Sequence, residues 1–271
     1  MFWDRAFVRI ARFLDERNEV RIGELVAEDL ARPLCSRTGV RREFARETVR
    51  VMQLLPPADP PNVFAIGRNY RAHVAETGAP LPEVPLIFQK ATTSLLPHEG
   101  AILLPEAAPH EVDFEAELAI VIGRTARRVS PEKAGDYVEG YTCANDVSAR
   151  DCQRSDKQWA RAKGFDTFCP LGPWLVTPDA LDPDRCAIRS RLNGRVMQDS
   201  HTSQMIFSCR YLISYVSHQF TLLPGTVILT GTPDGVGFAR KPPVFLRPGD
   251  RIEVEIEGLG TLVNHVRAAS G

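Results

Sequence analysis

Short apolar runs with the two-residue period of β-strands constrain the fold of this chain most strongly. Helical patterns are few: 130–138, where Ser130 caps and Pro131 takes the first helical position, 155–164, and 203–220 with a period near 3.6. Strands in irregular order with few helices argue against a doubly wound sheet, so the predicted fold class is mostly β with some α. The strand-like runs beyond residue 62 are 63–67, 86–90, 101–105, 112–123, 141–147, 186–194, 226–233 and 250–266.

The first 58 residues are separated from these runs by "PPADPPN" at 56–62, which has four prolines. Before it, 7–15 and 20–26 predict two strands around a polar turn, and 48–55 is a third apolar run. Residues 27–47 are basic and irregular, and we expect them to be partly helical. The predicted division is a small N-terminal α/β domain, 1–58, and a catalytic domain, 59–271. The first part is too short for a robust core, so we expect it to pack against the rest.

Composition and charge are ordinary for a soluble globular chain. Of the 271 residues, 44% are hydrophobic and 25% are charged, and the net charge of −1 is made of interspersed signs. We therefore expect no nucleic-acid partner and no membrane surface. The N-terminus lacks a signal-peptide pattern, and the six cysteines are scattered without a C-x-x-C. Reduced thiols and a cytoplasmic location are the prediction.

The segment 112–123, "VDFEAELAIVIG", carries the most informative side chains. In a strand, Glu115 and Glu117 point to the same side, and two carboxylates on a buried face repel each other unless a cation lies between them. Hard oxygen ligands select Mg²⁺, Mn²⁺ or Ca²⁺ over zinc. Taken alone, the pair is more often the solvated end of a strand. Asp146, at the end of the strand-like run 141–147, supplies a third ligand or else caps the next helix.

A second polar cluster lies in "IGRNYRAHVAETG" at 66–78. His73 and Glu76 share a face if this piece is helical, so they form either a catalytic dyad or an ordinary helix exterior. Other catalytic motifs are absent from the sequence. "GTPDGVG" lacks the Lys-Ser or Lys-Thr of a phosphate-binding loop, and neither G-x-G-x-x-G nor G-x-S-x-G occurs.

With these motifs in view, the chain resembles the fumarylacetoacetate hydrolase superfamily over about 60–267. The matching pieces occur in family order, among them "AIGRNYRAHVAE", "VDFEAELAIVIG", "NDVSARDCQ", "WARAKGFDTFCPLGPW" and "LLPGTVILTGTPDGVG". The resemblance implies the family's mixed β-sandwich roll, normally a homodimer. The 7–15 strand also resembles the small leading domain of longer bacterial members.

The resemblance also assigns roles to residues. Glu115, Glu117 and Asp146 match metal ligands, with Mg²⁺ or Mn²⁺ the usual ion and Ca²⁺ a further candidate. His73 and Glu76 match a dyad on a mobile segment, and Lys163 matches a lysine near the metal. The positions that match substrate contacts or the lining of the site are Arg68, Tyr70, Arg150, Gln153 and Thr232. Without the family pattern, Lys163 reads as a solvated helix lysine and Arg150 as a surface partner of Asp151.

The activity implied by the resemblance is metal-dependent hydrolysis of a C–C bond in acylpyruvate or fumarylacetoacetate-like diketo acids. Cleavage leaves a pyruvate enolate, which a cation and Lys163 stabilise, while a histidine held by a carboxylate activates water. Alternatives on the same site are an oxaloacetate decarboxylase and an isomerase or decarboxylase of hydroxydienoates from aromatic catabolism. A catalytically silent binding protein on the same fold is a further alternative.

Overall fold

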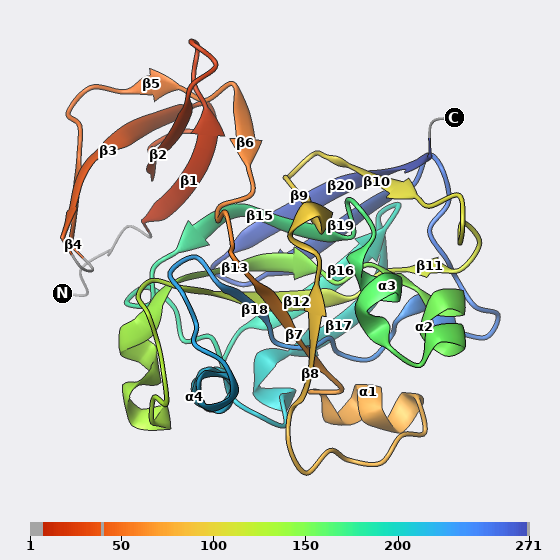
Figure 1. Cartoon of the computed structure of the whole chain (residues 1–271). Coiled ribbons are helices and arrows are strands. Elements are labelled where there is room, and N and C mark those ends of the chain that lie inside the picture. Colours follow the sequence, from red (N-terminus) through yellow and green to blue (C-terminus); the bar gives the residue numbers. More distant parts are fainter. Residues whose placement is uncertain (1–7, 39–40, 270–271) are drawn as a thin grey trace.

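The computed structural model describes residues 8–38 and 41–269 of the chain. Most of this part is built from β-strands, and Figure 1 shows them as one long, strongly twisted sheet with a second sheet packed across it. The long sheet has the strand order β4 (Arg41–Phe44), β3 (Leu30–Thr38), β2 (Val20–Leu25), β1 (Arg9–Leu14), β15 (Cys169–Val176), β13 (Val138–Asn145), β12 (Ala116–Ile122), β18 (Val227–Leu229), β7 (Val63–Gly67), β8 (Leu86–Lys90). Three short strands pair beside this path: β5 (Val49–Arg50), β6 (Gln53–Leu55) and β9 (Leu95–Leu96).

The second sheet and the helices complete the fold. The second sheet has the order β10 (Ala101–Leu104), β20 (Gly260–Ala268), β19 (Arg251–Ile256), β16 (Ala187–Leu192), β17 (Arg195–His201), and a two-stranded ribbon pairs β11 (Val112–Asp113) with β14 (Ser148–Ala149). The α-helices are α1 (Arg71–Glu76), α2 (Arg150–Asp156), α3 (Trp159–Gly164) and α4 (Cys209–Gln219). The 3₁₀ turns are η1 (Thr92–Ser94), η2 (Pro131–Tyr137), η3 (Thr202–Gln204) and η4 (Gly237–Ala239). The predicted fold class, mostly β with some α, is confirmed.

The N-terminal part differs from the prediction in one respect. Residues 27–47, expected to be partly helical, contain β3 and β4, and the described residues of 8–55 form strands only. They make a lobe at the upper left of Figure 1, with a small core of its own around Phe13. β1 pairs with β15 through Ile10 opposite Leu175, so the lobe extends the long sheet. The lobe therefore packs against the rest, as expected for so short a segment, while the domain boundary after residue 58 stays a prediction.

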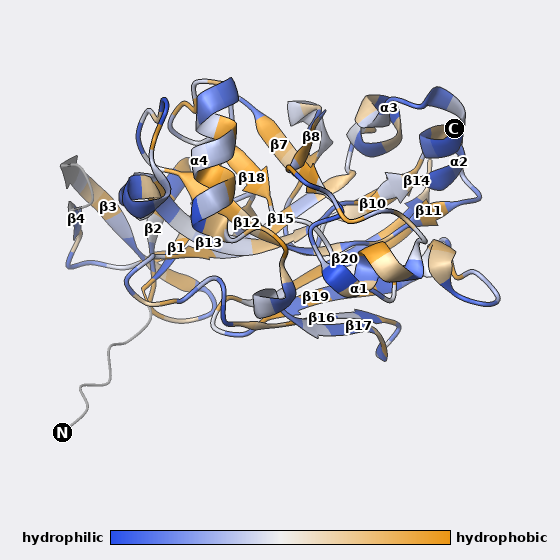
Figure 2. Cartoon of the chain, turned by 90° about the horizontal axis from the view of Figure 1, so that it is seen from below, coloured by the Kyte–Doolittle hydropathy of each residue, from blue (hydrophilic) through white to orange (hydrophobic). Residues whose placement is uncertain are grey.

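Strand β12 is the centre of the core because every residue of it is buried. Its sequence "AELAIVI" is apolar except at Glu117, and the strand lies between β13 and β18. Figure 2 shows β12, β18 and β7 in the hydrophobic colours. Such near-continuous apolar runs are typical of strands covered on both faces. The amphipathic helix α4 covers one face, with Leu212 and Val216 buried.

Strand directions then bring the polar chain segments to one edge of the long sheet. β12 and β13 are antiparallel, with Ala116 opposite Asn145, so the start of one strand meets the end of the other. β18 is antiparallel to β12 and parallel to β7, so both of these strands also end at that edge. The site of interest is formed by the segments that leave these strands.

Candidate metal centre and active site

Glu115, Glu117 and Asp146 meet at this edge. Oxygen atoms of the three carboxylates lie within 4.8 Å of one another, and all three residues are buried. Glu117 is in β12 and Asp146 follows β13. Glu115 lies between β11 and β12 rather than inside one continuous strand, where its N–H donates to Asn145 Oδ1 (2.9 Å) and its carbonyl accepts from Asp146 N (2.9 Å). The solvated strand end considered for Glu115 and Glu117 is therefore wrong. The cap considered for Asp146 is also wrong, since α2 begins after Ala149 without a side-chain cap.

Two buried lysines neutralise part of this negative charge. Lys163 Nζ, from α3, lies 2.7 Å from Glu115 Oε2 and 2.6 Å from Asp146 Oδ2, and Lys90 Nζ, from β8, lies 2.5 Å from Asp146 Oδ1. Burial alone would lower the pKa of Lys163, but Asp146 and Glu115 raise it above its ordinary value, so the group is an ammonium. At 2% exposure, Lys163 is not a solvated helix lysine.

Arg150 forms the opposite wall of the site. It is 3% exposed, and its guanidinium pairs with Asp113 (2.8 Å) and Glu115 (2.7 Å) rather than with Asp151. Burial alone would raise the pKa of Glu115, but Lys163 and Arg150 lower it overall. Asp113 also accepts from the N–H groups of Gly237 (2.8 Å) and Phe238 (3.1 Å), so it joins Arg150 to the chain beyond β18.

Glu117 is the carboxylate of the three without a lysine or arginine partner among the described residues. Its Oε2 accepts the N–H of Gly231 at 2.6 Å. Burial, followed by the charges of Asp146 and Glu115, raises the pKa of Glu117 well above its usual range. With Glu117 ionised, the four buried carboxylates Asp113, Glu115, Glu117 and Asp146 exceed the buried cations Lys90, Arg150 and Lys163 by one negative charge. A divalent cation would favour that ionised form and bring the net charge of the cluster to +1. An all-oxygen donor set with one uncompensated carboxylate fits Mg²⁺ or Mn²⁺.

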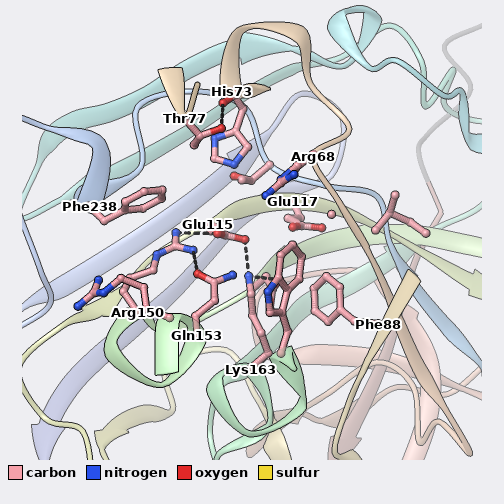
Figure 3. A pocket seen from close by; sticks show the side chains of 16 residues that line it. Arg68, His73, Thr77, Phe88, Glu115, Glu117, Arg150, Gln153, Lys163 and Phe238 are labelled. Atoms are coloured by element: carbon pink, nitrogen blue, oxygen red, sulfur yellow. Dashed lines mark hydrogen bonds and ion pairs between the residues drawn. The ribbon is translucent and has the colours of Figure 1, made fainter. Parts of the chain in front are cut away.

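The predicted dyad is formed by helix α1. His73 Nδ1 lies 2.8 Å from Glu76 Oε1, and Glu76 in turn accepts the N–H of Gly235 (3.0 and 3.2 Å). A carboxylate that accepts at Nδ1 fixes the proton on that nitrogen and leaves Nε2 as the acceptor. Figure 3 shows the His73 ring across the cavity from the carboxylates, with Arg68 beside it. His73 is 7% exposed, so the helix-exterior alternative does not hold.

These groups line one cavity of about 290 Å³. Tyr70 and Glu76 are not part of its lining: Glu76 acts behind His73, and Tyr70 is 1% exposed in the main hydrophobic core. The Tyr70 side chain therefore does not face the cavity, because it is enclosed in this core. The predicted residues that line the cavity are Arg68, His73, Glu115, Glu117, Asp146, Arg150, Gln153, Lys163 and Thr232.

Several groups at the site escaped prediction. Lys90 is the last residue of the strand-like run 86–90 and pairs with Asp146. A lysine at the end of an apolar run could have indicated a buried ion pair, because lysine is rarely buried without a partner. Trp159 and Phe88 line the wall beside Lys163, in edge-to-face contact with ring centroids 5.2 Å apart. Phe238 stacks over Arg150, with 4.3 Å between the guanidinium carbon and the ring centroid. The residue pattern gives no role to Trp159 or Phe238, because each acts through contacts between distant segments.

Comparison with known proteins agrees with this geometry. Residues 62–267 match the family model described as fumarylacetoacetate (FAA) hydrolase C-terminal. The mitochondrial oxaloacetate tautomerase FAHD2A of Bos taurus is 49% identical over 217 residues, covering 79% of this chain and 68% of that protein.

Solved structures cover nearly the whole chain. The 2-hydroxyhepta-2,4-diene-1,7-dioate isomerase of Mycobacterium marinum is 39% identical with a TM-score of 0.84, covering 97% of this chain and all of that one. The 5-carboxymethyl-2-hydroxymuconate delta-isomerase of Mycobacterium smegmatis is 41% identical with a TM-score of 0.84, covering 96% and 99%. The fold, the site and these similarities together show that the chain belongs to the fumarylacetoacetate hydrolase superfamily of enzymes.

Proposed function

We propose that this chain is a divalent-metal-dependent isomerase that interconverts the enol and keto forms of a small 2-oxo dicarboxylate of the oxaloacetate type. The observation that supports it most is one cavity in which a three-carboxylate site faces a buried ammonium, Lys163, and a histidine with a free Nε2, His73. The names of the relatives favour isomerisation over the C–C hydrolysis expected from the sequence, since they are a tautomerase and two isomerases.

Glu115, Glu117 and Asp146 would hold the cation. A bound divalent cation would supply Lewis-acid polarisation of the 2-oxo and carboxylate oxygens of the substrate. The side chains around it then stabilise the negative charge that develops on the enolate oxygen. Lys163 uses two N–H bonds on Glu115 and Asp146, which leaves the third for that oxygen.

The reaction moves one proton between the enol oxygen and C3 and leaves the formula of the substrate unchanged. It therefore requires a base that receives this proton and returns one, and it requires no attacking water. His73 suits the task because Glu76 holds Nδ1–H and leaves Nε2 to exchange the proton. Gly235 N–H anchors Glu76, so the ring keeps one orientation during the transfer.

The cavity also supports a second carboxylate on the substrate. Arg68 lines the cavity, is exposed, and has no acidic partner among the described residues. Its φ of 60° is unusual for a residue with a side chain, and such backbone strain concentrates at functional sites. With net charge +1 after a divalent cation binds, the cluster favours a dianion over a monoanion.

Hydrolysis of an acylpyruvate is the second candidate, and the His73–Glu76 pair favours it because this arrangement can also activate water. Decarboxylation of oxaloacetate needs the same enolate stabilisation without a base. A non-catalytic binding protein is the third candidate. A homodimer and a cytoplasmic location stay predictions of the sequence. In the described part of the chain, no helix is both long and apolar enough to cross a membrane.

One assay separates these candidates. Enol oxaloacetate is added to the protein with Mg²⁺, and the loss of enol absorbance is followed against spontaneous conversion, while pyruvate and bicarbonate are measured in parallel. We expect accelerated enol loss without pyruvate release. Pyruvate release from oxaloacetate would establish the decarboxylase, and cleavage of acetylpyruvate with no effect on enol oxaloacetate would establish the hydrolase. If the protein turns over none of these acids, the remaining candidate is the non-catalytic binding protein.

A further inference from the structure

The buried amide Gln198, in β17 of the second sheet, connects the carboxylate segment to the cavity. Its Oε1 accepts the N–H of Ala116 (2.9 Å), the residue between Glu115 and Glu117. Its Nε2 donates to Thr232 Oγ1 (2.7 Å) and to the carbonyl of Pro233 (2.8 Å). Gln198 is 1% exposed, so its amide is shielded from solvent and makes these hydrogen bonds instead of bonds to water.

The orientation of this amide is fixed by its backbone partners. Ala116 N–H can only donate and the Pro233 carbonyl can only accept, so a flipped amide would place donor against donor and acceptor against acceptor. Ser190 Oγ donates a further bond to Oε1 (2.9 Å). The NH₂ group of Gln198 must therefore face Thr232.

This orientation determines what the Thr232 hydroxyl can do. Because Oγ1 accepts a hydrogen bond from Gln198, its own proton must point elsewhere. Thr232 lines the cavity, and among the described residues its hydroxyl has no acceptor for that proton. A hydroxyl that is free to rotate could serve either as donor or as acceptor, whereas this one is restricted to donating into the cavity.

We propose that Gln198 is a positioning residue that fixes Thr232 as a hydrogen-bond donor to a carboxylate oxygen of the substrate. The inference rests on the proposed function only in taking the substrate to be a carboxylate. It adds that the cavity discriminates for an acceptor at this point, so ligands with a donor there bind less well. Gln198 does not line the cavity, so its effect on the substrate's carboxylate passes through the Thr232 hydroxyl.

The test measures binding of oxalate, a dicarboxylate with no keto–enol chemistry, by calorimetry at saturating Mg²⁺. Thr232→Val, which keeps the shape but removes the hydroxyl, should weaken oxalate binding about 10- to 100-fold, as expected for a hydrogen bond to a charged group. Thr232→Ser should restore most of it. Mn²⁺ affinity of Thr232→Val, measured without oxalate, should stay at the wild-type value, whereas damage to the carboxylate segment would lower it.

Gln198→Glu tests the polarity of the contact. One glutamate oxygen can still accept from Ala116, but the other accepts from Thr232 and turns the hydroxyl proton away from the cavity. Oxalate binding should fall at least as far as in Thr232→Val, and the loss in the double variant should be clearly smaller than the product of the two single losses, because both changes remove the same hydrogen bond. Losses that multiply in the double variant would overturn the role of Gln198.

If Gln198→Glu does not fold, the comparison of Thr232→Val with Thr232→Ser decides, and wild-type binding by Thr232→Val overturns the proposal. Failure of the proposed function is distinguishable, because a wild-type protein that binds oxalate yet turns over no oxo acid would contradict that function and leave this inference standing.

Discussion

The pairing of Asp113 with Arg150 provides a prediction whose magnitude follows from burial. Asp113 is 0% exposed and accepts from Arg150, Gly237 and Phe238, while Arg150 is 3% exposed. Replacing Asp113 by Asn preserves the volume and one acceptor oxygen, but it removes the charge and turns an NH₂ group toward other donors. Arg150 then keeps Glu115 as its one carboxylate partner.

Breaking a buried ion pair by removing one partner costs about 3–5 kcal/mol. We expect about 3 kcal/mol for Asp113→Asn, the lower end, because Glu115 still compensates Arg150. For a chain of this size, each kcal/mol lowers the melting temperature by roughly 2 °C, so the expected decrease is about 6 °C. The assay is thermal unfolding followed by circular dichroism at several scan rates.

A matched control is Asp199→Asn, which breaks the pair with Arg189 at the surface. The two side chains are 56% and 33% exposed, and exposed pairs contribute less than about 1 kcal/mol. A melting temperature for Asp113→Asn equal to that of Asp199→Asn would refute the reasoning, since burial would then not increase the contribution of an ion pair to the free energy of unfolding.

Four further predictions concern the site and the core. Lys163→Met should lower turnover by about 10²–10³, as expected for the loss of a group that stabilises developing charge, while Mn²⁺ still binds in a titration. His73→Gln should lower isomerisation and any hydrolysis of acylpyruvates far more than it weakens oxalate binding, and an equal loss of both would argue against a base. Dialysis against EDTA should abolish turnover, and added Mg²⁺ should restore it in wild type but not in Glu115→Ala. Burial raises the pKa of Cys143 to about 12, so the unfolded thiol loses its proton first, and this group alone lowers stability by about 1.4 kcal/mol per pH unit between pH 9 and 12. Urea unfolding of Cys143→Ala should show a slope reduced by that amount, while the buried Cys169, whose pKa is also raised to about 12, keeps its own share.

The metal site could be predicted because its residues follow from local pattern. Alternation placed Glu115 and Glu117 on one side, and a strand end marked Asp146. The sequence could not show that the strand is interrupted at Phe114 and Glu115, between β11 and β12. The interruption depends on the side-chain amides of Asn145 and Gln198, which accept the backbone N–H groups of Glu115 and Ala116. Lys90 and Gln198 were missed for the same reason, since their partners are 56 and 82 residues away in sequence.

The N-terminal strands were harder to predict for a different reason. β3 lies near the outer end of the long sheet, and its arginines and Pro33 interrupt the apolar alternation that would mark a strand. Pro33 lies opposite Gly23, where a Cβ would come within 2.6 Å of the Arg32 carbonyl oxygen. Pairing with β2, β4 and β5 makes this segment a strand, and that pairing is not visible in the segment itself.

Binding of Mn²⁺ tests the central claim most directly, because the ion can be counted by its electron paramagnetic resonance without any substrate. Wild-type protein should bind one Mn²⁺ per chain. Glu117→Gln should lose that binding, because among the described residues Glu117 is the one of the three carboxylates without an ion-pair partner, whereas Asp199→Asn should keep it. No Mn²⁺ binding in wild type, or undiminished binding in Glu117→Gln, would contradict the account.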